Sequence, residues 1–154
     1  MCFWRDDLKD ILKKCLKADV IVLGTPIYYG SISAYAQAFL ERLLFAADTY
    51  LIDEGGNRVS KIKKEVKTAM IYTMNVSKEM NYFNGEDQLA IMRRYLTNIF
   101  GKCEALYAYD TKQFKFYSPY LNNMFDAEHK DERYLNHFPK DCKKAFELGE
   151  KLSK

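Results

Sequence analysis

An uncharged segment, residues 25–33, holds the residues of this sequence whose types and spacing best suit a chemical role. It reads TPIYYGSIS, so small hydroxyl side chains flank two adjacent aromatic residues, Tyr28 and Tyr29. Such a segment can offer backbone N–H groups to the rim of a flat ring, and a helix beginning behind it would stabilise negative charge that develops there on reduction. Hydrolysis is disfavoured, because the segment has no acid, base or set of metal ligands. The pattern indicates a seat for an electron-accepting ring, although ordinary aromatic packing at a strand end is the simpler alternative.

The elements on either side of this segment place it where a ligand is expected. Residues 19–24 form a short unbroken run rich in β-branched side chains, which is typical of a strand covered on both faces. Residues 25–30 follow as a loop, punctuated by Pro26 and Gly30. A helix capped by Ser31 or Ser33 comes next, with apolar positions spaced three and four apart: Ile32, Tyr35, Ala36, Phe39, Leu40, Leu43 and Leu44. Open parallel sheets bind ligands beyond the carboxyl ends of their strands, so this loop is the first place to look.

Helices and strands alternate along the rest of the chain. Further strands are predicted at residues 66–72 and 103–109, a hairpin turn at residues 53–57, and a helix at residues 89–100. A first helix, capped by Asp6 or Asp7, has the apolar face Leu8, Ile11, Leu12, Cys15 and Leu16. A last helix opens at Pro139 and carries Cys142, Ala145, Phe146 and Leu152. This alternation predicts an α/β fold with right-handed crossovers and a parallel sheet.

The predicted sheet has too few strands to cover its most apolar strand on both edges. Residues 20–23 are the most apolar run, and such a strand normally lies near the middle of a parallel sheet with a neighbour on each edge. Only one helix precedes it in the sequence. We therefore expect that strands belonging before Met1 are missing from this sequence.

Composition narrows the function classes. The chain has 154 residues, is 48% hydrophobic and carries a net charge of +3, which predicts one domain without a nucleic-acid or membrane surface. It has no signal segment and no apolar run of about 18 residues, so a soluble cytoplasmic protein is expected. Four cysteines without a CxxC pair and two histidines disfavour a zinc or iron–sulfur site. Cys15, Cys103 and Cys142 are interpreted as core residues, and His129 and His137 as surface residues.

Two charged features and one aromatic segment have plain interpretations. The lysines at 61, 63, 64 and 67 are interpreted as a solvated loop flank, because apolar and acidic residues interrupt them. Arg42 is expected to pair with an acidic neighbour near the end of its helix, with contact to a substrate as the alternative. Residues 107–120 are rich in tyrosine and could form a lid, a dimer surface or packing over a sheet edge.

The residues around the uncharged segment also resemble a known family. Residues 18–34 (ADVIVLGTPIYYGSISA) and FLER at 39–42 closely resemble the NADPH-dependent FMN reductase family of flavodoxin-like proteins. Members of that family show an apolar run followed by (S/T)P-(I/V)Y-(Y/F)G-x-(V/M/I)SA and then F(I/L)(D/E)R. Residues 2–7 (CFWRDD) resemble the family's C-x-x-x-DD, and residues 138–149 resemble its last helix. The resemblance covers nearly the whole chain, and residues 25–34 are its most specific part.

The resemblance implies a flavodoxin-like, three-layer αβα fold with a parallel sheet that lacks its first two strands. The family's sheet has the strand order 2-1-3-4-5, and the strands of this chain correspond to the third, fourth and fifth. The first strand, the Gly/Ser-rich phosphate loop, the following helix and the second strand would then precede Met1. Residues 1–154 would form one partial domain of a truncated or mis-started chain; the alternative is a divergent chain that completes its sheet in another way.

The resemblance also implies FMN as cofactor and NAD(P)H as co-substrate. Carried over by position, the residues that would contact the isoalloxazine ring are Thr25, Pro26, Ile27, Tyr28, Tyr29, Gly30, Ser31 and Ile32, with Thr73, Met74 and Asn75 in a second loop. That second loop is often Gly-rich in the family and is not so here, so a plain loop is the alternative. The phosphate-binding residues cannot be carried over. Cys2 matches a position that belongs to an iron–sulfur cysteine cluster in some relatives, but it stands alone here.

Two functions remain from the sequence. The first is an FMN-dependent oxidoreductase that passes hydride from NAD(P)H through bound FMN to a small acceptor, such as a quinone, a nitroaromatic or free flavin. No catalytic side chain is needed for this reaction, because the cofactor supplies the chemistry. The second is a non-catalytic flavodoxin-like binding module, or a remnant that binds FMN weakly without a phosphate loop. The expected partners are a small-molecule acceptor and a second copy of the chain in a homodimer.

Overall fold

Three parallel strands form the body of the sheet, and they pair in the order in which they occur along the chain. The computed structural model describes residues 6–80 and 85–154, and the side-chain surroundings of residues 6–80 and 89–154. Strand β1 (Val20–Tyr28) pairs with β5 (Lys67–Thr73), and β5 pairs with β6 (Cys103–Ala108). The parallel arrangement predicted from the alternation of elements is confirmed.

A two-residue strand extends the sheet on one side. Strand β2 (Ser31–Ile32) pairs antiparallel with the end of β1, and the order across the sheet is β2-β1-β5-β6. The predicted loop at residues 25–30 is therefore partly wrong, since β1 continues to Tyr28 and only Tyr29 and Gly30 form the turn. The backbone can stay extended there because the parallel partner β5 runs alongside as far as Thr73.

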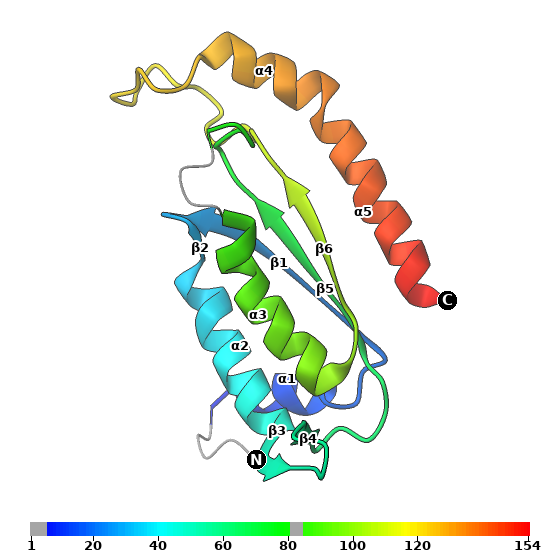
Figure 1. The fold of residues 1–154 in the computed structure, drawn as a ribbon. Helices are drawn as coiled ribbons and strands as arrows, with labels where there is room; N and C mark the ends of the chain where they lie inside the picture. Colours follow the sequence, from blue (N-terminus) through cyan, green and yellow to red (C-terminus); the bar gives the residue numbers. More distant parts are fainter. Residues whose placement is uncertain (1–5, 81–84) are drawn as a thin grey trace.

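Helices cover both faces of the sheet, which gives three layers (Figure 1). Helices α2 (Ala34–Ala47) and α3 (Gly85–Phe100) lie against one face, and α5 (Phe138–Ser153) lies against the other. Helix α1 (Leu8–Cys15) packs beside α2 near the amino ends of the strands, whereas α4 (Ala127–Asn136) lies beyond their carboxyl ends. In the described part of the chain, no helix has an apolar run that could cross a bilayer.

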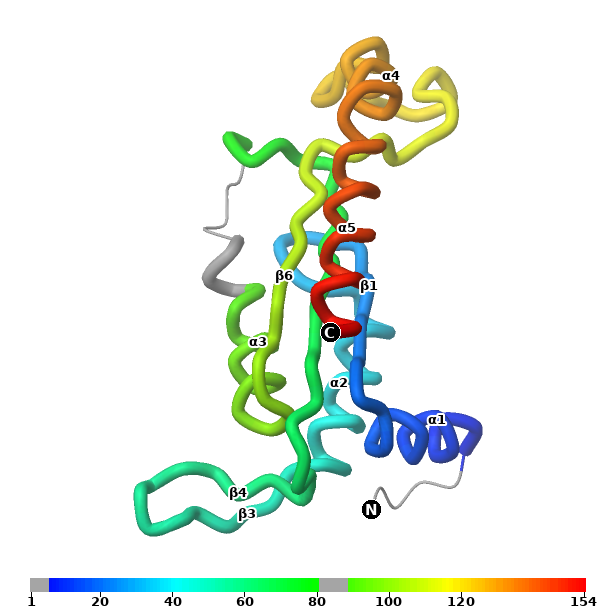
Figure 2. The backbone as a smooth tube through the Cα atoms, turned by 90° about the vertical axis from the view of Figure 1, so that its right-hand side faces the viewer, coloured from blue at the N-terminus to red at the C-terminus, as the bar shows by residue number. Residues whose placement is uncertain are grey.

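A second, two-stranded sheet projects from the end of the molecule opposite α4 (Figure 2). Strands β3 (Asp48–Ile52) and β4 (Arg58–Ser60) pair antiparallel. The Asp53 carboxylate accepts hydrogen bonds from the backbone N–H groups of Gly55 and Asn57, at 2.9 and 2.8 Å, which closes the connecting turn. The hairpin turn predicted at residues 53–57 is confirmed.

The centre of the core lies on β5 rather than on β1. Thr68, Ala69, Met70 and Tyr72 are each at most 1% exposed, because β5 is paired on both edges. The prediction that residues 19–24 are covered on both faces is wrong for the described part of the chain, where Val22 is 49% exposed. Helix α5 packs mainly over β5 and β6, so one face of β1 lacks a helix of its own among the described residues.

The predicted helices are present, with some differences at their caps and faces. Ser33 caps α2, and its Oγ accepts from the backbone N–H of Ala36 at 3.3 Å. The carboxylate of Asp6 pairs with the guanidinium of Arg42 at 2.6 and 2.9 Å, which confirms the expected acidic partner of Arg42. Several residues expected on apolar faces are largely exposed because the helices cover only part of the sheet: Ile11, Tyr35, Cys142 and Phe146. The expectation from the sequence that Cys142 is a core residue is therefore wrong.

Helix α4 is missing from the sequence-based prediction. Its sequence, AEHKDERYLN, is so rich in charged residues that no apolar face marks it. The helix begins at an N-cap aspartate, Asp126, whose side chain accepts from the backbone N–H of Glu128 at 3.1 Å.

We expect opposite effects from the same substitution at two glycines, one directly after α3 and one inside α5. Gly101 follows α3 with φ of 113°, and an added Cβ would lie 2.9 Å from the Glu65 side chain. Gly101→Ala should therefore lower the free energy of unfolding by about 1–3 kcal/mol. Gly149 lies inside α5 with open space around its Cβ position, so Gly149→Ala should raise it by about 0.5–1 kcal/mol. Urea titrations followed by circular dichroism measure both, and equal shifts in the same direction would contradict the assignment.

Candidate functional site

A tight hairpin stands at the carboxyl end of β1, where the sequence predicts the ligand seat. Tyr28 pairs with Ser31 and Ile27 pairs with Ile32, so only Tyr29 and Gly30 form the turn. Both turn residues have positive φ, 50° for Tyr29 and 79° for Gly30, which is the type I′ pattern of two-residue hairpins. The turn directs the Tyr29 side chain fully into solvent, and Tyr28 is 57% exposed.

A buried threonine joins this hairpin to the start of α2. Thr25 is 3% exposed, and its Oγ1 accepts from the backbone N–H of Ser33 at 3.2 Å. The same hydroxyl lies 3.2 Å from Ser33 Oγ and 3.0 Å from the carbonyl oxygen of Pro26. Since Ser33 in turn caps α2, these bonds fix the position of the hairpin relative to the amino-terminal end of that helix.

The strand register brings the two predicted ring-contacting segments together. Pro26 of β1 lies directly opposite Thr73 of β5 in the parallel pairing. The first segment, residues 25–32, and the second, residues 73–75, therefore emerge side by side at the carboxyl edge of the sheet. Carboxyl ends of neighbouring parallel strands are where open α/β sheets bind their ligands. The site residues proposed from the sequence thus share one location.

Burial divides these residues into a fixed base and an accessible rim. Thr25, Gly30, Ile32 and Met74 are buried. Pro26, Ile27, Thr73 and Asn75 are half-buried, whereas Tyr28, Tyr29 and Ser31 are exposed. The groups available to a ligand are therefore uncharged backbone, hydroxyl and amide groups next to two aromatic rings. The first turn of α2 holds no acidic residue, so the positive end of its dipole is not neutralised there.

The loop after β5 is tied to the loop after β6 by main-chain bonds. The N–H of Met74 donates to the carbonyl of Ala108, and the N–H of Thr111 donates to the carbonyl of Met74, both at 3.0 Å. The N–H of Asp110 donates to the carbonyl of Val76 at 2.9 Å. These bonds join the two loops into one unit at the carboxyl edge of the sheet, a connection that the sequence alone did not predict.

A buried ion cluster supports this unit from the side of α4. Lys130 is 1% exposed, and its Nζ donates to a carboxylate oxygen of Asp110 and to the backbone carbonyl of Asn75. The Oδ2 atom of Asp110 also lies 2.7 Å from Nε2 of His129 and 3.2 Å from Nε of Arg133. Phe125 lies under the ammonium group, with its ring centroid 4.9 Å from Nζ. Lys130 thus connects α4 directly to the second predicted segment.

The charge state of Asp110 follows from these contacts. Burial alone raises the pKa of this carboxyl group, but hydrogen bonds from Lys130 and His129 outweigh that effect, and the pKa lies below its usual value. Asp110 also has φ of 57°, a left-handed conformation that aspartate tolerates better than most residues. A charged carboxylate therefore lies just beyond the end of β6.

Aromatic side chains pack below this edge of the sheet. The rings of Tyr72 and Tyr107 lie with centroids 5.1 Å apart, and Tyr107 stacks on Tyr109 at 5.9 Å. The hydroxyl of Tyr72 donates to the carbonyl of Leu89 at 3.2 Å, and burial raises the pKa of Tyr72 well above its usual value. Tyr72 therefore acts as a neutral structural residue rather than as an acid or base.

Sequence reasoning missed the cluster around Asp110 and interpreted His129 only as a surface residue. The His129 side chain is 49% exposed, yet it has a defined partner in Asp110. One signal was present, because Asp110 comes directly after the predicted strand at residues 103–109 and therefore at the carboxyl edge. Nothing in the charged sequence of α4 distinguished Lys130 from its exposed neighbours. Among the described residues, no group of three or more His, Cys, Asp or Glu side chains could hold a metal ion, and Cys2 lies outside them.

Comparison with known proteins identifies the fold family. A sequence model for proteins of flavodoxin-like fold matches residues 4–117, which is most of the chain. The chain belongs to this flavodoxin-like family. Its parallel strands β1, β5 and β6 and their flanking helices have the three-layer α/β arrangement of that fold.

Short segments of this flavodoxin-like chain are similar to two curated proteins. An iron-sulfur flavoprotein from Methanocaldococcus jannaschii is 46% identical over 37 residues, which are 24% of this chain and 19% of the relative. An iron-sulfur flavoprotein from Archaeoglobus fulgidus is 37% identical over 41 residues, which are 27% of this chain and 20% of the relative. The matched segments thus span about a fifth of each relative.

Two solved structures share the fold at low sequence identity. The chain aligns with a candidate quinone reductase from Klebsiella pneumoniae at a TM-score of 0.54 and 13% identity, over 84% of this chain and 51% of the other. It aligns with a structure described as a thermophilic tryptophan halogenase from Streptomycin violaceusniger at a TM-score of 0.51 and 14% identity, over 85% and 74%. These likenesses support the fold.

Thr25→Val should loosen the junction between the hairpin and α2. The substitution keeps the shape of the side chain but leaves the backbone N–H of Ser33 without its acceptor. We expect the free energy of unfolding to fall by about 1–3 kcal/mol, as for a part-buried donor that loses its partner. Ser31→Ala is the control, because Ser31 is exposed and lies on the same hairpin. Equal effects of the two substitutions in urea titrations would count against the role of Thr25.

Asp110→Asn should destabilise the protein strongly at neutral pH. Asparagine tolerates the same left-handed backbone, so the substitution removes the charge and leaves Lys130 buried beside a neutral partner. Loss of one member of a buried pair is expected to lower the free energy of unfolding by about 3–5 kcal/mol. Asp131→Asn is the matched control, because Asp131 pairs with Lys112 but is 56% exposed, and its effect should stay within about 1 kcal/mol.

The effect of Asp110→Asn should depend on pH in one direction. Because the folded pKa of Asp110 is lowered, its contribution is complete above the unfolded pKa and is lost as pH falls through the folded pKa. The difference in unfolding free energy between the natural protein and the variant should therefore shrink below about pH 3.9, the unperturbed value for aspartate. Urea titrations across the acid range measure it, and a difference that grows on acidification would overturn this account.

Proposed function

We propose that this chain is an FMN-dependent oxidoreductase that uses NAD(P)H to reduce a small acceptor such as a quinone, a nitroaromatic or free flavin. The observation that carries the proposal is the pairing of Pro26 with Thr73, since it joins two uncharged segments at the carboxyl edge of a flavodoxin-like sheet. The named relatives are consistent with it, because two are flavoproteins and one structural neighbour is described as a candidate quinone reductase.

The residues at this edge fit a flat ring with a polar rim. Tyr28 and Tyr29 expose aromatic surface at the tip of the hairpin, which a planar ligand can cover by stacking. Thr73 and Asn75 offer backbone and side-chain polar groups beside it. The Oδ1 atom of Asn75 is buried without a hydrogen-bond donor among the described residues. A ligand with an N–H or O–H group could donate a hydrogen bond to this oxygen if the loop moved to expose it.

The protein residues would position and stabilise, while the cofactor would supply the redox chemistry. The two segments would hold FMN, which when bound would supply the chemistry for transferring a hydride from the nicotinamide to the acceptor. The amino-terminal end of α2 would stabilise negative charge beside the hairpin, and the absence of acidic residues in its first turn preserves this effect. Pro26 and Ile27 would form the wall under the ring, and Tyr28 and Tyr29 would limit what stacks above it. No side chain is required to move a proton in the hydride step.

The proposal is tested by titrating the purified protein with FMN and following flavin fluorescence. Quenching that saturates, together with oxidation of NADH or NADPH when FMN and a quinone are added, is the expected result. Saturable FMN binding without nicotinamide oxidation would instead support a non-catalytic flavodoxin-like module. Failure of both measurements on folded protein would overturn the assignment of a flavin seat.

Removal of the hairpin aromatics should weaken FMN binding without unfolding the protein. Tyr29→Asn keeps a residue that tolerates positive φ, and Tyr28→Thr keeps a residue that favours strands, so the turn is preserved. Each substitution should reduce FMN affinity by about three- to tenfold, as expected for one lost aromatic contact of roughly 0.5–1.5 kcal/mol. Tyr50→Thr is the control, because Tyr50 is 86% exposed on the distant hairpin β3–β4. Unchanged affinity in both hairpin variants would place the ring elsewhere.

A further inference from the structure

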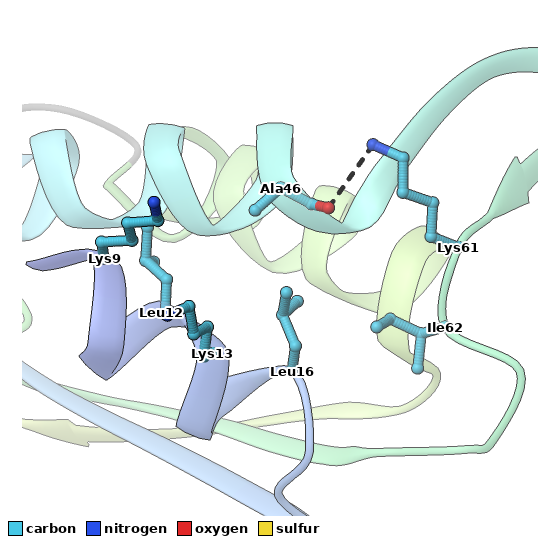
Figure 3. Close-up of a pocket in the computed structure, with 7 residues that line it drawn as sticks. All are labelled: Lys9, Leu12, Lys13, Leu16, Ala46, Lys61 and Ile62. Atoms are coloured by element: carbon cyan, nitrogen blue, oxygen red, sulfur yellow. Dashed lines mark hydrogen bonds between the residues drawn. The ribbon is translucent and has the colours of Figure 1, made fainter. Parts of the chain in front are cut away.

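A hollow lies at the amino-terminal end of the sheet, opposite the candidate flavin site. It has a volume of about 300 Å³ and lies between α1, the end of α2 and the segment that leads into β5. Figure 3 shows the side chains around it. The lining residues are Lys9, Leu12, Lys13, Leu16, Ala46, Lys61 and Ile62.

The floor of this hollow is apolar. Leu12 and Ala46 are 3% and 5% exposed, and Leu16 and Ile62 are half-buried against the main core. Leu12 reaches it from α1 and Leu16 from the residue that follows this helix, whereas Ala46 closes it from α2 and Ile62 from the opposite side (Figure 3). The floor therefore continues the core to the surface and can take the apolar part of a ligand.

The rim carries positive charge that the described residues do not balance. Lys9 has no ion pair in the described part of the chain, and Lys13 pairs only with Asp10, which is 80% exposed. Lys61 Nζ lies 3.4 Å from the carbonyl of Ala46, so it occupies an acceptor at the end of α2 and has no carboxylate partner in the described ranges. Three lysines thus surround the hollow with one solvent-exposed carboxylate beside them.

The spacing along α1 combines both properties on one helix face. Residues 9, 12 and 13 of α1 and its C-cap Leu16 follow the three- and four-residue spacing of a helix face, so Lys9 neighbours Lys13 and both neighbour the leucine positions. Two like charges at this spacing repel each other, and an anion between them would relieve the repulsion. The hydrocarbon next to that anion would lie over the leucines. The face is thus complementary to a molecule with a charged head and an apolar chain.

We propose that this hollow binds a medium-chain carboxylate, with its head between Lys9 and Lys13 and its chain over Leu12, Leu16 and Ile62. The volume is at the small end of the range for ligand pockets, about 300–1,000 Å³, which fits an acid of the size of decanoate. Charge-assisted hydrogen bonds from the two lysines select the anion, and burial of the chain adds affinity. The proposal is independent of flavin binding at the other end of the sheet.

The test compares three probes of equal chain length: decanoate, decanol and decylammonium. Binding is measured by calorimetry, and its location by amide chemical shifts in NMR spectra. Decanoate should bind about tenfold more tightly than decanol, with shifts confined to α1, the end of α2 and residues 61–62. Decylammonium should not bind at these residues. Equal binding of decanoate and decanol, or shifts located elsewhere, would overturn the proposal.

Matched double variants distinguish the effect of the two rim lysines on binding from the effect of the protein's overall charge. Lys9→Gln with Lys13→Gln should reduce decanoate affinity about tenfold and leave decanol affinity unchanged. Lys14→Gln with Lys17→Gln removes the same charge from exposed positions outside the lining and should leave decanoate affinity unchanged. Leu16→Gln should weaken both probes, because it places an amide in the apolar floor. Equal losses in the two lysine variants would show a general charge effect and contradict the site.

Discussion

The parallel register between β1 and β5 is the constraint on which the candidate site depends. Because Pro26 lies opposite Thr73, two segments that are more than forty residues apart in the sequence are held at one edge of the sheet. A slip of one residue would move every side chain of β1 to the other face, and burial of Thr25 opposes such a slip. Thr25 also bonds to Ser33 at the start of α2, so the same residue links the strand, the hairpin and α2.

The second support of the site comes from the end of the chain. Lys130 on α4 bonds to Asp110 after β6 and to the carbonyl of Asn75 after β5, and it therefore couples a helix to both loops. A buried lysine is unfavourable without a counter-charge, and here Lys130, Arg133 and the imidazole of His129 surround a single carboxylate. The arrangement stabilises one conformation of the carboxyl edge. The tip of the β1–β2 hairpin, with its exposed tyrosines, remains accessible to a ligand.

The two ends of the sheet have different chemistry. The carboxyl edge offers uncharged polar groups and aromatic rings around the positive end of a helix dipole. The amino edge offers an apolar floor rimmed by lysines from α1 and from the segment before β5. Strand β1 connects the two ends, and one of its faces is only partly covered in the described part of the chain. Ligands at the two ends would thus be recognised by separate sets of residues.

Local patterns in the sequence were sufficient for most of the elements and for predicting where a candidate site lies. The apolar run of β1, the capping Ser33, the turn at residues 53–57 and the alternation of helix with strand each act over a few residues, so periodicity and turn chemistry reveal them. The same is true of the uncharged segment after β1, whose position at a carboxyl edge follows from the order of the elements alone.

Only the tertiary structure decided which residues share an environment. Helix α4 and its buried Lys130 could not be found, because burial of a lysine depends on an aspartate twenty positions away in the sequence. The exposure of Tyr35 and Phe146 was also unpredictable, since it depends on how much of the sheet each helix covers. The sequence by itself determined most of the α/β elements and the uncharged segment after the first strand, because these follow from neighbouring residues. The pairing of Pro26 with Thr73, the ion cluster at Asp110 and the lysine-rimmed hollow arise from long-range packing, which no local pattern encodes.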